Sequence, residues 1–398
     1  MNYFHDPFRQ TNYLQQSLAQ DKIPLGLFIG AGCPLSIKIQ DEKGDHPLIP
    51  DIQGLTKIIC DKYNKNNPQM EAFQKIFSQI KQDGVNDPNI EDILSHIRSL
   101  RQVAGSDIVR GLDARTLDKL DNAISETIAL TANKRLPSID SPYHKAAAWV
   151  SSASRSEPVE FFTTNYDLLI EQALEELRVP YFDGYVGSFM TFFDPQAMEE
   201  DSIPPRWARL WKLHGSINWI VDEKNVVHRS YGQAKGERRL IHPSHLKYDE
   251  SRRMPYLAMI DRLKAFLKKP SCVLVICGYS FRDDHINEVL IQGLQGNSSG
   301  IIFSLLFGPL KEYPKAIELG SRRTNFNILA EDESIIGTKR AAWIESDSAD
   351  KYSTNSIAVD WILKAEKITD VVKVARFKLG DFNNFGQFLE ELIGLEQK

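Results

Sequence analysis

Short apolar runs rich in β-branched residues recur along this sequence, and helical patterns separate them. The runs cover residues 25–29, 158–162, 209–213, 272–277 and 301–307. Strands that alternate with helices pair in parallel, because each connection has to cross back along the sheet. The sequence therefore predicts an α/β fold, namely a Rossmann-like parallel sheet with helices on both faces.

The spacing of the runs also predicts how the chain is divided. Residues 52–152, between the first and second runs, have helical patterns with polar connections, and a crossover needs only about a dozen residues. We expect a helical insertion here, covering a cleft of a domain that spans residues 1–309. The segment 310–398 lacks the motifs of the earlier strand ends and finishes in a helix with one apolar face, so we expect an accessory or assembly element.

Composition restricts the class of protein. The chain has 398 residues, of which 42% are hydrophobic and 25% charged, as is typical of a soluble globular protein. A net charge of −5 and the lack of a basic arm argue against direct nucleic-acid binding. The sequence shows neither a secretory signal nor an apolar run long enough for a membrane span, so we expect a cytoplasmic protein. Four scattered cysteines predict neither a disulfide framework nor a zinc ribbon.

The first apolar run ends in a turn made of Gly30, Ala31 and Gly32. Glycines let the backbone turn sharply and approach a ligand closely, so that N–H groups face a pyrophosphate. A tight turn between a strand and a helix explains the same residues, and the third glycine of the full dinucleotide fingerprint is missing. Taken alone, the turn leaves both interpretations open.

Polar residues follow the later runs at the same place, directly after each strand. Asn165 and Asp167 follow the second run, and His214 follows the third. Ligands of such sheets bind beyond the carboxyl ends of the strands. An amide binds a ribose hydroxyl or a water, a carboxylate accepts from a carboxamide, and an imidazole takes up a proton near neutral pH.

The fourth run opens into a turn that carries Gly278 and Ser280 and reaches Asp283 and Asp284 at the head of a helix. A serine hydroxyl binds a phosphate or a ribose, and an aspartate holds the hydroxyls of an adenosine ribose. An aspartate at a helix start is equally a cap that favours the positive end of the helix. We expect one of the two aspartates to be only a cap and assign Asp283 to the ligand.

In this order along the chain, the Gly-Ala-Gly turn, the segment Thr-Thr-Asn-Tyr-Asp, the His-Gly pair and the turn Gly-Tyr-Ser resemble motifs of the sirtuin superfamily, over roughly residues 20–310. The segment Ile-Pro-Asp that ends at Asp51 is similar to another motif of that family. The resemblance implies an NAD site. It implies the following roles: Gly30, Ala31 and Gly32 at the phosphates, Asp51 in the cofactor pocket, Asn165 at the nicotinamide ribose, Asp167 at the nicotinamide amide, His214 as general base, and Gly278 and Ser280 at the adenosine half.

The departures from the family are informative. Deacylating sirtuins follow their His-Gly pair with paired cysteines that hold zinc, whereas this chain has no cysteine between Cys60 and Cys272, so no zinc is expected. The segments Thr-Thr-Asn-Tyr-Asp and Gly-Tyr-Ser-Phe-Arg-Asp are more similar to a bacterial branch associated with antiphage defence, whose members hydrolyse NAD. Within that branch, the chain is most similar to the short proteins that are paired with a HerA-type ATPase, because only a short segment follows Pro309. The chain has no phosphate loop of its own, so the ATPase activity is expected in the partner.

The resemblance thus implies an NAD+ hydrolase that depletes NAD in antiphage defence, in complex with a HerA-type ATPase and as a homo-oligomer, with Asn165 and His214 as catalytic residues. Two alternatives stay open: an NAD-dependent protein deacylase and a non-catalytic nucleotide sensor or scaffold. A DNA-cutting activity is a lesser alternative, since the spacing of His242 and His245 suits a metal, although a surface loop is the favoured interpretation.

Overall fold

The computed structural model describes residues 4–41, 44–64, 68–137, 140–189, 191–200, 202–222, 226–230, 238–241, 255–344, 357–367 and 370–394. The pair His242 and His245 lies outside these residues. Among the helices that are described, none is both long and apolar enough to cross a membrane.

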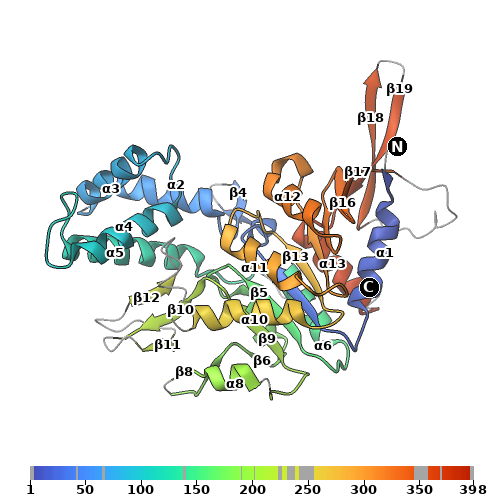
Figure 1. Cartoon of the computed structure of the whole chain (residues 1–398), viewed down its shortest axis with the longest axis horizontal. Helices are drawn as coiled ribbons and strands as arrows, with labels where there is room; N and C mark the ends of the chain where they lie inside the picture. Colours follow the sequence, from blue (N-terminus) through green and yellow to red (C-terminus); the bar gives the residue numbers. More distant parts are fainter. Residues whose placement is uncertain are drawn as a thin grey trace.

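A ten-stranded sheet forms the centre of the molecule, in the order β1-β17-β16-β15-β14-β13-β2-β5-β9-β6 (Figure 1). Its strands are β1 Phe4–His5, β2 Leu25–Ile29, β5 Val159–Thr163, β6 Tyr181–Phe182, β9 Ala208–Lys212, β13 Val273–Cys277, β14 Ile301–Leu305, β15 Phe326–Leu329, β16 Glu333–Ile336 and β17 Lys339–Trp343. In the described sheet, only β16 runs antiparallel to its neighbours. The expected α/β architecture with a largely parallel, Rossmann-like sheet is confirmed.

Helices cover both faces of this sheet. Side chains of one strand alternate between the faces, so that Leu27 and Ile29 belong to one buried cluster and Phe28 to the other. The first cluster includes residues of α1 Pro7–Leu18, α6 Pro142–Ser151, α7 Leu169–Glu176 and α13 Phe382–Leu392. The second includes residues of α10 Tyr256–Lys268, α11 Asp284–Leu294 and α12 Pro314–Arg322.

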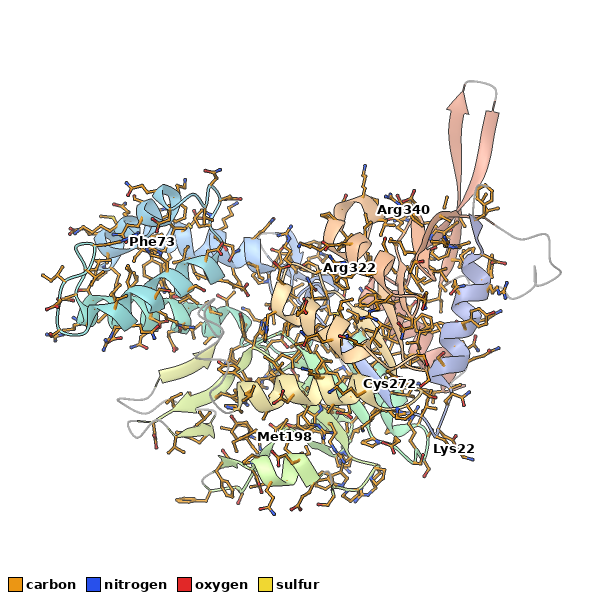
Figure 2. The ribbon with its side chains drawn as sticks, in the orientation of Figure 1. Lys22, Phe73, Met198, Cys272, Arg322 and Arg340 are labelled. Carbon is orange, nitrogen blue, oxygen red and sulfur yellow. The ribbon has the colours of Figure 1, made fainter. Side chains whose placement is uncertain are left out.

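A bundle of four helices projects from one side of the sheet, drawn in blue to teal in Figure 1. It consists of α2 Ile52–Tyr63, α3 Met70–Gln82, α4 Ile90–Ala104 and α5 Ala114–Ala132. The bundle has its own buried cluster, in which Phe73 is 1% exposed; Figure 2 shows Phe73 among these helices and Cys272 in the body of the main sheet. The helices expected as one insertion over 52–152 thus divide, because α6 packs on the sheet and not in the bundle.

Residues after Pro309 complete the main sheet. They supply β15, β16 and β17, and α13 packs against α6. A two-stranded ribbon, β18 Val359–Lys367 with β19 Asp370–Phe377, extends away from the body in Figure 1. Part of the segment 310–398, expected as an accessory element, therefore belongs to the main sheet, and its part in assembly stays a prediction.

Smaller elements complete the molecule. A second sheet has the order β11-β10-β12, and two short hairpins pair β3 with β4 and β7 with β8. The bounds are β3 Lys38–Asp41, β4 Gly44–Pro47, β7 Tyr185–Val186, β8 Phe192–Phe193, α8 Pro195–Glu200, β10 Gly215–Val221, β11 Val227–Arg229 and β12 Arg238–Ile241, with 3-10 turns at Pro34–Ser36 and Leu310–Glu312.

Candidate active site

The last residues of four neighbouring strands lie in one row across the sheet. Cys277 of β13 pairs with Ile29 of β2, which pairs with Thr163 of β5, which pairs with Lys212 of β9. The four motifs predicted as strand ends follow directly after these residues. The structure therefore brings the motifs together at one edge of the sheet, where ligands of this architecture bind.

The Gly-Ala-Gly turn packs against the turn after β13, backbone to backbone. The N–H of Gly30 donates to the last carbonyl of β13 (2.9 Å), and the N–H of Gly32 donates to the carbonyl of Gly278 (2.8 Å). A Cβ atom on Gly30 would lie 2.3 Å from that same Gly278 oxygen. Both glycines are thus required by a neighbouring backbone. Of the three residues, Ala31 alone has an N–H without a hydrogen bond in the described part of the chain, so the phosphate role of this turn stays a prediction.

Asn165 is held rigidly beside this turn. Its backbone N–H donates to the hydroxyl of Thr163 (3.0 Å), and its side-chain Nδ2 donates to the carbonyl of Gly30 (3.1 Å). The residue is 7% exposed, and its Oδ1 has no hydrogen-bond partner among the residues that the structure describes. A buried acceptor without a donor is costly, which indicates that a ligand group or a water supplies one.

Asp167 is also buried, and it lies near the buried amine of Lys212. Its Oδ1 accepts from the N–H of Leu169 (3.1 Å), and the Lys212 amine donates to its backbone carbonyl. The same amine lies 3.1 Å from Oε1 of Glu171. Burial raises the pKa of Asp167, and the positive charge of Lys212 opposes that rise.

Sequence reasoning missed Lys212 and Glu171. The signal was a lysine between Trp211 and Leu213 at the end of a buried strand, where a charged side chain needs a buried partner. Together they fix the segment that carries Asn165 and Asp167.

His214 contacts the turn after β13. Its Nε2 lies 3.0 Å from Oδ2 of Asp283, and both side chains are largely buried. The other carboxyl oxygen, Oδ1, accepts from the N–H groups of His285 (2.9 Å) and Ile286 (3.2 Å) at the start of α11. Asp283 is therefore a helix cap and a partner of His214. The expected contact of Asp283 with an adenosine ribose stays a prediction.

The other expected ligand residues lie at the start of helices or turns. Asp51 caps α2 by accepting from the N–H of Gly54 (2.8 Å). Gly278 has a left-handed φ of +68°, and Ser280 is exposed on the same turn. Their contacts with NAD stay predictions.

The helical bundle packs directly against the site. Tyr166, Leu168 and Ile217, which adjoin the site residues in the sequence, all contact the buried cluster of the bundle. The hydroxyl of Tyr166 donates to Oε1 of Glu91 on α4 (3.4 Å), and the carbonyl of Tyr166 accepts from the N–H of Ile217 (3.0 Å). The bundle thus lies over the carboxyl ends of β5 and β9.

One protein family and several solved structures are similar to this chain. Residues 159–328 match the SIR2-like domain family, a stretch that runs from β5 to β15 and includes Asn165, His214 and Asp283. None of the curated proteins compared with the chain matches it.

Solved structures similar to the chain include three Sir2 proteins. A Sir2 homologue in complex with NAD is 14% identical, with 79% of this chain and 89% of that chain covered and a TM-score of 0.41. A mutant Sir2 homologue with ADP-ribose is 13% identical (76% and 87% covered, TM-score 0.36). A Sir2 enzyme studied for its mechanism and regulation is 12% identical (74% and 86% covered, TM-score 0.36). Residues 159–328, less than half of the chain, are thus similar to the SIR2-like domain family.

Proposed function

We propose that this protein hydrolyses NAD+ at the bond between nicotinamide and ribose, releasing nicotinamide and ADP-ribose. The observation that carries the proposal is the buried Oδ1 of Asn165, an acceptor with no donor in the described part of the chain, at the strand end next to that of His214. Buried amide oxygens are usually hydrogen-bonded, so this one favours a ligand group or a water as its donor.

The roles of the residues follow from the chemistry of the bond. As nicotinamide leaves with the bonding electrons, positive charge develops on the ribose, and a water adds to the carbon left behind. Asn165 Oδ1 accepts a hydrogen bond from a ribose hydroxyl or from that water, and His214 takes up the proton that the water loses. Asp167 orients the nicotinamide amide. These contacts accelerate the reaction to the extent that they bind the transition state more tightly than NAD+.

Two observations support hydrolysis over the alternatives. Zinc-dependent deacylases of the sirtuin type have paired cysteines after the His-Gly pair, and the sequence has none there. The strand end of Asn165, with its unsatisfied amide oxygen, lies next to that of His214, and these are the two polar groups that hydrolysis needs. The protein is expected to act without zinc.

We further propose that the hydrolase is the effector of an antiphage defence system and depletes NAD in complex with a HerA-type ATPase. This proposal rests on the likeness of the strand-end motifs to that bacterial branch. The turn of Gly30, Ala31 and Gly32 lacks the lysine and the serine or threonine of an ATP-binding phosphate loop. The ATPase activity is therefore assigned to the partner.

The test is to incubate the purified protein with NAD+, with and without the HerA-type ATPase partner, and to identify the products. ADP-ribose and nicotinamide are the expected products. Asn165→Ala and His214→Ala are expected to abolish NAD+ loss while the protein stays folded. Asn64→Ala, an exposed asparagine at the end of α2, is the matched control and is expected to retain full activity.

Three outcomes would contradict the proposal. Parental turnover by a folded Asn165→Ala or His214→Ala variant would refute the site. Intact NAD+ with tight binding under both conditions would favour a sensor. A requirement for an acylated peptide would favour a deacylase.

A further inference from the structure

We propose that Asp283 is a positioning residue that fixes the orientation and the protonation of the His214 ring. This inference rests on the proposed function, because it assigns His214 the role of proton acceptor. It differs from a role in ribose binding, and it follows from where the two side chains originate in the sheet.

The two residues belong to strands that are not neighbours. His214 follows β9 and Asp283 follows β13, and both β5 and β2 lie between these strands. Three strand spacings separate the strand ends by about 14 Å. Nevertheless, Nε2 of His214 lies 3.0 Å from Oδ2 of Asp283. The two turns therefore reach toward each other across the ends of β5 and β2, where Asn165 and Gly30 lie.

The turn that carries Asp283 is held in an unfavourable conformation. Phe281 has a φ of +61°, a left-handed value that is rare for a bulky side chain, and it is fully buried. Its carbonyl accepts from Nδ2 of Asn287 (2.8 Å), and its ring packs 4.7 Å from that of Tyr279. The Tyr279 hydroxyl donates to the carbonyl of Asp283 and to Oδ1 of Asn287, each at 3.1 Å. Strain of this kind persists where the surroundings enforce it, and here they fix the position of Asp283.

The carboxylate of Asp283 divides its two oxygens between two tasks. Oδ1 accepts from two N–H groups of α11, and Oδ2 faces His214. A helix cap alone is served equally well by asparagine. An asparagine, however, would present its NH2 group to the histidine nitrogen, where only an acceptor suits an N–H donor. The cap of α11 does not require a carboxylate at this position, whereas the contact with an N–H group of His214 does.

The consequence for His214 is chemical. In this proposal the proton on Nε2 faces the carboxylate of Asp283, 3.0 Å away, and Nδ1 is the nitrogen that takes up the proton of the water. Once both nitrogens are protonated, the adjacent carboxylate stabilises the imidazolium through a charge-assisted hydrogen bond. Asp283 itself contacts no reacting atom in this account.

The experiment compares Asp283→Asn with Asp284→Asn. The first variant keeps the helix cap and removes the acceptor that faces His214. The second makes the same change of charge one residue further on, at an exposed carboxylate near Lys315, and is the matched control. For Asp283→Asn we expect an unchanged melting temperature, a kcat lowered by about 10²-fold or more and a nearly unchanged KM, since general-base catalysis contributes about 10²–10⁴-fold. For Asp284→Asn we expect parental values.

A second readout needs no NAD+. The side-chain nitrogens of ¹⁵N-labelled histidines report which ring nitrogen carries the proton, and the signals of His214 are assigned by their loss in His214→Ala. We expect the Nε2-protonated form in the parent and in Asp284→Asn, and a shift away from it in Asp283→Asn.

The two readouts separate the two proposals. A parent that leaves NAD+ intact overturns the hydrolase, while the nitrogen signals still decide whether Asp283 sets the state of His214. Unchanged nitrogen signals in Asp283→Asn overturn the positioning role, as does a parental kcat. A kcat that rises in Asp283→Asn also overturns it, because the contact would then obstruct the site.

Discussion

Removing the charge of Lys212 is expected to destabilise the fold and to make its stability depend more strongly on pH. Lys212 is 2% exposed; its amine lies 3.1 Å from the carboxylate of Glu171 and donates to the backbone carbonyl of Asp167, and these two residues are 8% and 5% exposed. Lys212→Met keeps most of the apolar stem and deletes the ammonium group. It leaves two buried carboxyl groups without their cation.

The magnitude follows from that arrangement. Removing one partner of a buried ion pair costs about 3–5 kcal/mol of unfolding free energy, because the remaining charge stays buried. Burial raises the pKa of both carboxyl groups, and Lys212 opposes the rise in each. In the variant both pKa values therefore rise further. Between the ordinary carboxyl pKa and the raised one, the folded state binds more protons than the unfolded chain, so stability falls as the pH rises through that window.

Urea denaturation at pH 5 and pH 8 measures both effects. We expect the deficit of Lys212→Met to be larger at pH 8 than at pH 5, and we expect Lys212→Met/Glu171→Gln to recover part of it, since one uncompensated charge is gone. Lys268→Met, an exposed lysine in the last turn of α10, is the control and is expected to change little. The reasoning fails if Lys212→Met lies within about 1 kcal/mol of the parent at both pH values, because surface substitutions already produce changes of that order.

Two further predictions concern the packing of the turns and the ribbon. Gly30→Ala is expected to destabilise by about 1–3 kcal/mol and more than Gly32→Ala, because the new Cβ would lie 2.3 Å from a backbone oxygen in the first case and 2.9 Å from a Cα atom in the second. Thermal melting compares them, and equal losses would refute the packing argument. Replacing residues 362–374 of the β18–β19 ribbon with an Asn-Gly turn is expected to lower the number of subunits per particle while the melting temperature is retained. An unchanged number of subunits would remove the ribbon from assembly.

Much of the fold could be predicted because apolar runs and strands coincide. The five runs each lie within one or two residues of β2, β5, β9, β13 and β14. The strands β15–β17 were missed because they are short and because the chain carries no polar motif after them. Polar motifs at strand ends indicate where a site lies. The extent of the sheet is indicated by the apolar runs, which continue after those motifs have ended.

The gathering of the strand-end residues was predictable, but the contacts that they make were not. Parallel strand ends meet at one edge, so Asn165 and His214 could be placed together from the order of the motifs alone. The pairing of His214 with Asp283 spans two intervening strands and depends on the left-handed φ of Phe281, which no residue pattern indicates. Glycines that a neighbouring backbone requires have the same sequence signature as glycines that a phosphate requires, and so the role of Gly30 could not be decided.

The bundle of α2–α5 contacts the candidate site through Tyr166, Leu168 and Ile217, and Tyr166 is bonded directly to Asn165. Tyr166 packs into the core of the bundle, and Asn165, the residue before it, holds its amide against the glycine turn. Any separation of the bundle from the sheet must therefore either pull that amide out of place or withdraw the tyrosine from the bundle. A partner that binds and displaces the bundle together with Tyr166 therefore also displaces the side chain of Asn165 at the end of β5.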